Sequence, residues 1–208
     1  MRPNGLPLRS LNVAADREEP FGPPVRMRLG GPMTNDGMWL PHDQDPRMQA
    51  TPTRGERECL VGYLDFYRGT LALKCDGLSA EQLATKAVPP SNISLLGLVR
   101  HMARVEQSWF RRVIPGNLEL PRIFQDEDAG FDFGEVDDEL VRYSQEQWQS
   151  EVAHALEVMD RTDLDEVVDV HGEPTEVRDI VVHMIEEYAR HCGHADLVRE
   201  VVDGRTGL

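Results

Sequence analysis

From about residue 54 to the C-terminus, apolar residues recur at steps of three and four positions. This spacing places them along one face of an α-helix, whereas a half-buried strand would alternate apolar and polar residues. The pattern predicts long helices over approximately residues 56–75, 94–113, 136–161 and 175–202, and it contains no strand-like alternation. Four long amphipathic helices joined by linkers are expected to form an all-α fold, a four-helix bundle.

Two shorter segments between the helices also have a local signature. Ser79 followed by Gln82 three residues later is a capping box, which predicts a short helix at that point. The acidic stretch 125–139 predicts a loop between the second and third long helices, with Phe131 and Phe133 able to anchor it.

Residues 1–52 differ in composition from the rest of the chain. They hold nine prolines and five glycines and have no helical period, which predicts an irregular N-terminal arm. Residues 53–208 are then the bundle domain. Scattered apolar residues, Met38 and Trp39 among them, could dock the arm on the bundle. Because the four helices lie downstream, we expect residues 1–50 to be dispensable for folding.

Charge and hydropathy exclude several classes of function. The chain of 208 residues has a formal net charge of −15, which repels phosphate groups, so binding to nucleic acid or to anionic membranes is not expected. No apolar run approaches the ~20 residues that span a bilayer, and no secretory signal is recognisable. The three cysteines lack C-x-x-C spacing and suit a reducing compartment. We therefore expect a soluble, cytoplasmic protein. Whether it forms a homodimer stays an open question.

Polar residues interrupt the apolar stripes of two predicted helices. At 100° per residue, His191 falls at the centre of the stripe of the last helix, and Glu187 lies on its flank one turn earlier. A Glu and a His four residues apart can offer two ligands to one ion. His101 lies on or near the inward face of the second helix and is a third candidate. Three such ligands would leave a position open for water or substrate.

Each of these residues also has a plainer interpretation. From spacing alone, His101 is more commonly a core histidine bonded to a backbone carbonyl, and Glu187 with His191 fits a surface pair. Cys192 is a possible ligand or nucleophile, but a small buried side chain is the commoner role. The remaining histidines outside the last helix fit loops or the surface: His42, His154 and His171.

Two segments resemble signatures of the DinB-like superfamily. Residues 94–101 (SLLGLVRH) and 106–110 (EQSWF) are similar to its second helix, and residues 183–197 (HMIEEYARHCGHADL) are similar to its last helix. The resemblance covers the chain from about residue 54 and is greatest to the actinobacterial branch related to mycothiol-dependent transferases and maleylpyruvate isomerase. It implies an up-down-down-up four-helix bundle.

The resemblance also implies a metal held by His101, Glu187 and His191. Many relatives carry His-x-x-x-His followed by Arg-Gly-Gln, whereas this chain has Glu187-x-x-x-His191 followed by Cys192-Gly193-His194. The exchange of His for Glu is similar to the mycothiol-dependent branch. His194 stands where the relatives have Gln, so it is either an extra polar group beside the metal or a partner of a ligand.

The function that the resemblance implies is a metal-dependent S-transferase, in which a low-molecular-weight thiol, mycothiol, reacts with an unidentified electrophile. Zn²⁺ is the expected metal and Ni²⁺, Mn²⁺ or Fe²⁺ the alternatives, since mixed N/O ligation suits all of them. His194 and Arg190 are candidates for moving a proton or stabilising a developing charge. Two rivals stay open: another reaction at the same metal, such as hydrolysis, and a non-catalytic helical module with a structural metal that His194 or Cys192 completes.

Overall fold

The computed structural model describes residues 37–49, 54–125 and 130–207, and most of them are helical, as the sequence predicts. Long helices are α1 (Glu56–Cys75), α3 (Leu95–Glu106) with its continuation η2 (Gln107–Val113), α4 (Asp138–Arg161) and α5 (Val177–Asp203). Short helices are η1 (Pro46–Gln49) and α2 (Ala80–Ala84). Within these ranges, no helix is long and apolar enough to cross a membrane.

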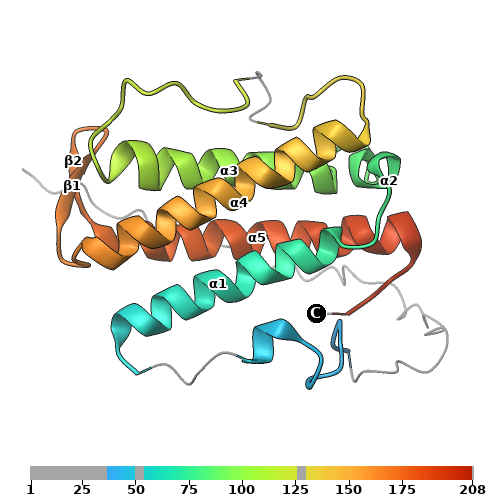
Figure 1. The fold of residues 1–208 in the computed structure, drawn as a ribbon, viewed down its shortest axis with the longest axis horizontal. Helices are drawn as coiled ribbons and strands as arrows, with labels where there is room; N and C mark the ends of the chain where they lie inside the picture. The colour runs from blue at the N-terminus through green and yellow to red at the C-terminus, as the bar shows by residue number, and fades with distance from the viewer. Residues whose placement is uncertain (1–36, 50–53, 126–129, 208) are drawn as a thin grey trace, which may run out of the picture. The chain divides into compact units, whose positions relative to one another are not determined.

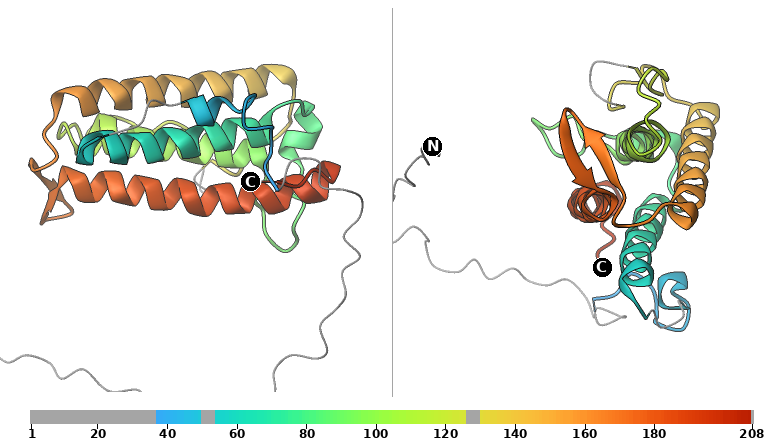
Figure 2. Two further views of the ribbon diagram at one scale, coloured as in Figure 1. Left: turned by 90° about the horizontal axis from the view of Figure 1, so that it is seen from below. Right: turned by 90° about the vertical axis from the view of Figure 1, so that its left-hand side faces the viewer.

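The long helices lie side by side with their apolar faces turned inward. Helices α1 and α5 run in one direction and α3 and α4 in the opposite direction (Figure 1). Helix α1 packs along α5, and α3 packs along both α4 and α5 (Figures 1 and 2). The core between them is formed by residues such as Leu64, Met102, Ala155 and Met184, all almost fully buried. Burying a Leu or Met side chain contributes ~1.5–3 kcal/mol, so the apolar stripes hold the helices together.

Side-chain caps start several helices at the predicted positions. The capping box of Ser79 and Gln82 is present at α2, and the hydroxyl of Ser94 accepts a hydrogen bond from Gly97 N–H (3.1 Å) at the start of α3. Asp137 accepts one from Leu140 N–H (2.8 Å) at α4. These bonds satisfy N–H groups that have no partner within the helix, and they fix where each helix begins.

A β-hairpin lies where the sequence predicts a linker without strands, so that prediction is wrong. Strands β1 (Val167–Val170) and β2 (Glu173–Glu176) pair antiparallel, with Val167 opposite Glu176 and Val170 opposite Glu173. Both residues of the turn have positive φ, 56° at His171 and 89° at Gly172, as a two-residue hairpin turn of type I′ requires. The strands are short and mostly exposed, so they carry no apolar alternation for sequence analysis to detect.

The second predicted helix has the expected extent but changes its winding halfway. Its last seven residues form the π-helix η2, in which Ile114 N–H donates to the carbonyl of Trp109, five residues earlier (2.9 Å). A π-helical turn holds more residues than an α-helical turn, so it changes the direction in which the following side chains point. Apolar periodicity does not distinguish the two windings.

Part of the predicted N-terminal arm packs against the helices. Trp39 is only 3% exposed, and its ring lies against three cationic side chains: Lys74 (4.0 Å), Arg199 (5.1 Å) and Arg205 (3.7 Å). Such contacts contribute ~0.5–2 kcal/mol each, in addition to the burial of the ring. Residues 1–36 and 50–53 lie outside the described residues, and the expectation that residues 1–50 are dispensable for folding stays a prediction.

We expect Trp39→Ala in the full chain to lower the free energy of unfolding by roughly 3–5 kcal/mol, because it empties a buried site beside the three cations. Deleting residues 1–36 should change it by no more than ~0.5 kcal/mol. Urea unfolding followed by circular dichroism measures both changes, with Leu118→Ala at an exposed position as the control. A loss below ~1 kcal/mol for Trp39→Ala would show that residues 37–49 are not part of the core.

Candidate metal centre

His101 of α3 and Glu187 and His191 of α5 come together where these two helices pack. One potential ligand atom of each residue lies within 4.8 Å of the other two. Nε2 of His191 is 3.4 Å from Oε2 of Glu187, and the ring centroids of His101 and His191 are 4.8 Å apart. The structure therefore brings together the three residues that the sequence nominates, from two separate segments of the chain.

The local sequence of α3 determines where His101 is held. The Ser94 cap begins the helix two turns before His101. The ring of Phe131 stacks on the imidazole of His101 (5.2 Å between centroids), and this contact anchors the loop as predicted. Residue 130 must be glycine, because its φ is 106° and a Cβ there would lie 2.8 Å from the backbone nitrogen of His101.

The three candidate ligands are partly buried, with 12% of the His191 side chain and 19% of the Glu187 side chain exposed. Burial, together with the neighbouring His101, His194 and Arg190, lowers the pKa of His191 to about 4. The imidazole of His191 is therefore neutral at pH 7, which is the form that binds a metal. Two imidazoles and one carboxylate at this spacing, closed on one side by the core, fit a divalent cation such as Zn²⁺.

The other polar residues of this stretch of α5 have different positions. His194 is half-buried, and its Nδ1 lies 3.3 Å from Nδ1 of His191, on the side of that ring away from Nε2. Arg190 is exposed. Cys192 is buried against α1, where its thiol contacts the carbonyl of Tyr67 (3.4 Å), and burial raises its pKa to about 12. These contacts agree with the plainer interpretation of Cys192 as a core side chain.

A pocket of about 200 Å³ opens beside His101 and Glu187. Six of the lining residues were not nominated from the sequence: Arg104, Val105, Ser108, Trp109, Arg122 and His183. Nε2 of His183 is 3.7 Å from Oε1 of Glu187, and its ring packs edge-on against Trp109 (5.2 Å). His183 stands four residues before Glu187, so the same helical spacing could have nominated it. Arg104 and Val105 lie on α3, Ser108 and Trp109 lie on the π-helix, and Arg122 lies in the loop that follows.

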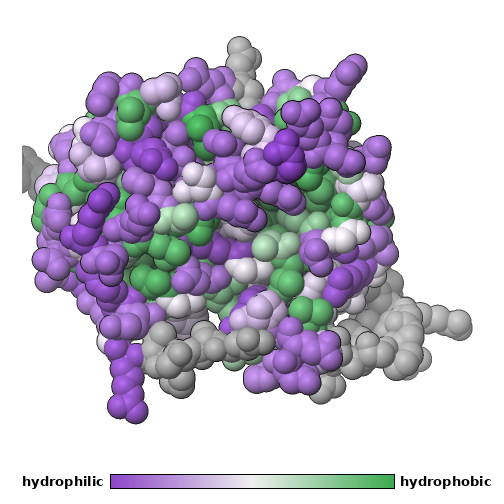
Figure 3. All heavy atoms as spheres, viewed as in Figure 1, coloured by the Kyte–Doolittle hydropathy of each residue, from purple (hydrophilic) through white to green (hydrophobic). Residues whose placement is uncertain are grey.

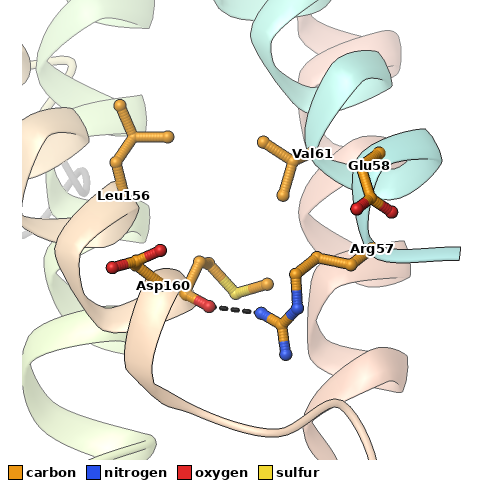
Figure 4. A pocket seen from close by; sticks show the side chains of 6 residues that line it. Arg57, Glu58, Val61, Leu156 and Asp160 are labelled. Atoms are coloured by element: carbon orange, nitrogen blue, oxygen red, sulfur yellow. Dashed lines mark hydrogen bonds between the residues drawn. The ribbon is translucent and has the colours of Figure 1, made fainter. Parts of the chain in front are cut away.

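A separate pocket of about 270 Å³ lies between α1 and α4 (Figure 4). Arg57 reaches across it and donates to the carbonyls of Met159 and Thr162, the latter at 2.7 Å. These carbonyls end α4 and have no partner within the helix, so the guanidinium caps it. Among the residues that the structure describes, none that lines this pocket is a histidine or a cysteine. Arg57 therefore links α1 to the end of α4 at this pocket. The pocket is not a second candidate metal centre.

On the face of the molecule formed by α1 and α4, apolar side chains are visible between hydrophilic ones (Figure 3). Tyr63 of α1 and Leu156 of α4 are among the exposed large apolar residues. Single exposed apolar side chains are ordinary on protein surfaces, so they do not by themselves mark an interface.

The fold and the site together define a helical protein with a candidate divalent-metal centre that opens into a small pocket. The sequence model of the mycothiol-S-transferase family matches residues 59–204, which is more than half of the chain. The chain therefore belongs to that family, and the resemblance noted in the sequence is confirmed. Among curated proteins, none matches the chain.

We expect the purified protein to contain about one divalent metal ion per chain and His191→Ala to lose it, since the variant removes one of three ligands. Inductively coupled plasma mass spectrometry measures the metal, and circular dichroism checks the fold. His42→Ala is the matched control, because it removes an exposed imidazole outside the triad. Full metal content in His191→Ala would rule out this centre.

Proposed function

We propose that this chain is a metal-dependent S-transferase that joins mycothiol to an electrophile, with the metal held by His101, Glu187 and His191. The observation that carries the proposal is the convergence of these three side chains in a member of the mycothiol-S-transferase family. The helix directions agree with a DinB-like four-helix bundle, which we take to be the fold. Zn²⁺ is the metal that we propose, with Ni²⁺, Mn²⁺ and Fe²⁺ as alternatives.

The chemistry needs a thiolate at neutral pH. A free thiol has a pKa of about 8.5 and is mostly protonated at pH 7, and coordination to a divalent metal lowers that pKa. Cys75 and Cys192 do not serve this purpose, because both are buried with their pKa values raised to about 12. Cys59 is exposed on α1 and belongs neither to the candidate metal group nor to the described lining of the pocket beside it. The nucleophile is therefore expected to come from the small-molecule thiol.

His194 has a positioning role in this proposal. If Nε2 of His191 faces the metal, Nδ1 of His191 must carry the proton, and Nδ1 of His194 at 3.3 Å can accept it in a hydrogen bond. This bond selects the tautomer of His191 and fixes the orientation of its ring. His194 would then act on the metal through His191, whereas the role of Arg190 stays a prediction.

The contacts of His194 and Cys192 also weigh against a purely structural metal. A structural zinc site has four protein ligands as a rule. Among the described residues, the group that could hold an ion contains His101, Glu187 and His191 alone. Neither Cys192, which contacts the backbone of Tyr67, nor His194, which contacts the far side of His191, belongs to it. A three-ligand centre beside a pocket favours a reactive site.

We expect His194→Ala to weaken metal binding by roughly 10–100-fold, the usual cost of losing the partner of a metal-binding histidine. His194→Gln should recover most of the affinity, because its amide oxygen can accept the same proton. Competition with a metal-binding dye measures the affinity of each variant. Equal losses for both variants would mean that His194 does not act through a hydrogen bond to His191.

We expect wild-type protein to catalyse the reaction of mycothiol with 1-chloro-2,4-dinitrobenzene, a general electrophile. The thiol sulfur bonds to the ring carbon, chloride departs with the bonding electron pair, and the thiol proton passes to the buffer. A chelator that removes the metal should abolish the reaction, and added Zn²⁺ should restore it. Glu187→Gln should bind metal less tightly because it removes the negative charge, and Glu187→His should bind it again as a His-x-x-x-His pair.

Activity that persists after the metal has been removed would refute this proposal. Hydrolysis of an ester probe without thiol consumption, at the same metal, would favour the hydrolase alternative instead.

A further inference from the structure

The outward face of α5 carries apolar side chains, although the chain as a whole has a net charge of −15. Helix α5 packs on α1 and α3 and lies along one edge of the group of described helices (Figure 2). On its opposite side, Leu197 is 57% exposed and Val201 is 63% exposed, and exposed Gly193 lies one turn before Leu197. At about 100° per residue, these three positions fall within about 80° of one another around the helix. They form a continuous surface, termed here the α5 strip.

Gly193 is not required by the fold of a single copy. It lies inside the helix, where glycine is less stable than alanine because it loses more conformational freedom on folding. Apart from its own stretch of helix, a Cβ at this position would meet no described atom within 4 Å. The missing side chain instead leaves a hollow on the helix surface, into which a side chain of another helix can pack closely.

Two charges of opposite sign flank the strip. The side chains of Arg190 and Glu200 are exposed, and neither makes a hydrogen bond or ion pair within the part of the chain that the structure describes. Arg190 lies about 20° to one side of Leu197 around the helix, and Glu200 lies about 60° to the other side. Because they are separated by ~15 Å along one helix, they cannot pair with each other within one copy.

We propose that the α5 strip is the interface of a homodimer, in which α5 of one copy packs antiparallel on α5 of a second copy. A two-fold axis at the level of Ala195 exchanges the two ends of the strip and also its two sides. Gly193 then faces Leu197 of the second copy, and Arg190 faces Glu200 of the second copy. Each contact occurs twice, as in any interface between two identical surfaces.

The pattern of charge favours a second copy over a different partner. A net charge of −15 makes two copies repel each other in general, so association needs a place where opposite charges meet. The α5 strip offers such a place to itself, because the positive charge at one end matches the negative charge at the other. One pair of helices buries no more than the ~1,200 Å² of the smallest stable interfaces, so we expect a dissociation constant on the order of 10 μM.

Sedimentation equilibrium of the full chain from about 1 to 100 μM measures this constant. Arg190→Glu should raise it at least about tenfold, because the variant places carboxylates opposite each other, and Glu200→Arg should raise it similarly. The double variant Arg190→Glu with Glu200→Arg should return it to within about threefold of wild type, because the exchanged charges attract again. Since the two residues cannot pair within one copy, this recovery would identify a contact between copies.

Gly193→Leu should also raise the dissociation constant at least about tenfold, because the new side chain fills the hollow that Leu197 of the second copy occupies. Circular dichroism should show an unchanged or higher helix content for this variant, since leucine is the better helix former. Arg142→Glu is the matched control for charge reversal and should leave the constant unchanged, because Arg142 is exposed on α4 and pairs there with Glu146.

A monomer at every concentration would overturn the inference. So would a double variant that associates as weakly as the single variants, or a loss in Arg142→Glu equal to that in Arg190→Glu, which would reflect general repulsion. The measurement needs no thiol and no turnover, so its outcome is independent of the transferase proposal.

Discussion

A buried ion pair between Arg68 of α1 and Glu106 of α3 joins the helices at the centre of the molecule. Nε and Nη2 of Arg68 bond to the two carboxylate oxygens at 2.8 and 2.9 Å. The hydroxyl of Tyr188 donates to Glu106 (2.8 Å), and the indole N–H of Trp148 donates to that hydroxyl (2.8 Å). One network thus connects all four long helices. Burial raises the pKa of Glu106, and the guanidinium of Arg68 counteracts that rise.

The network has consequences for the candidate site because of its place in the sequence. Tyr188 follows Glu187 directly, and Glu106 lies five residues after His101. A shift of α3 along α1 and α5 would separate Glu106 from both Arg68 and Tyr188 and leave a charge buried without its partners, which costs ~3–5 kcal/mol. The bonds that fix this register therefore also fix the distance between His101 and the two α5 residues. The π-helix starts at the next residue, Gln107, and turns Ser108 and Trp109 toward the pocket.

Sequence periodicity predicted α1, α3 with η2, α4 and α5 to within about two residues at each end, because each helix buries one continuous apolar face. The same reasoning placed His101 and His191 inward. It missed features that depend on contacts between distant segments. Arg68 and Glu106 are charged residues that only a partner from another helix allows to be buried. Trp39 had no periodic pattern around it, and Arg122 reaches the pocket through a loop.

The distribution of charge links the fold to the proposed chemistry. Glu187 would offset part of the charge that a divalent ion held with His101 and His191 would add. A third imidazole in place of Glu187 would leave the centre more positive by one charge. In the proposed transferase, the carboxylate at this position therefore lowers the positive charge that the metal centre presents to the incoming thiol.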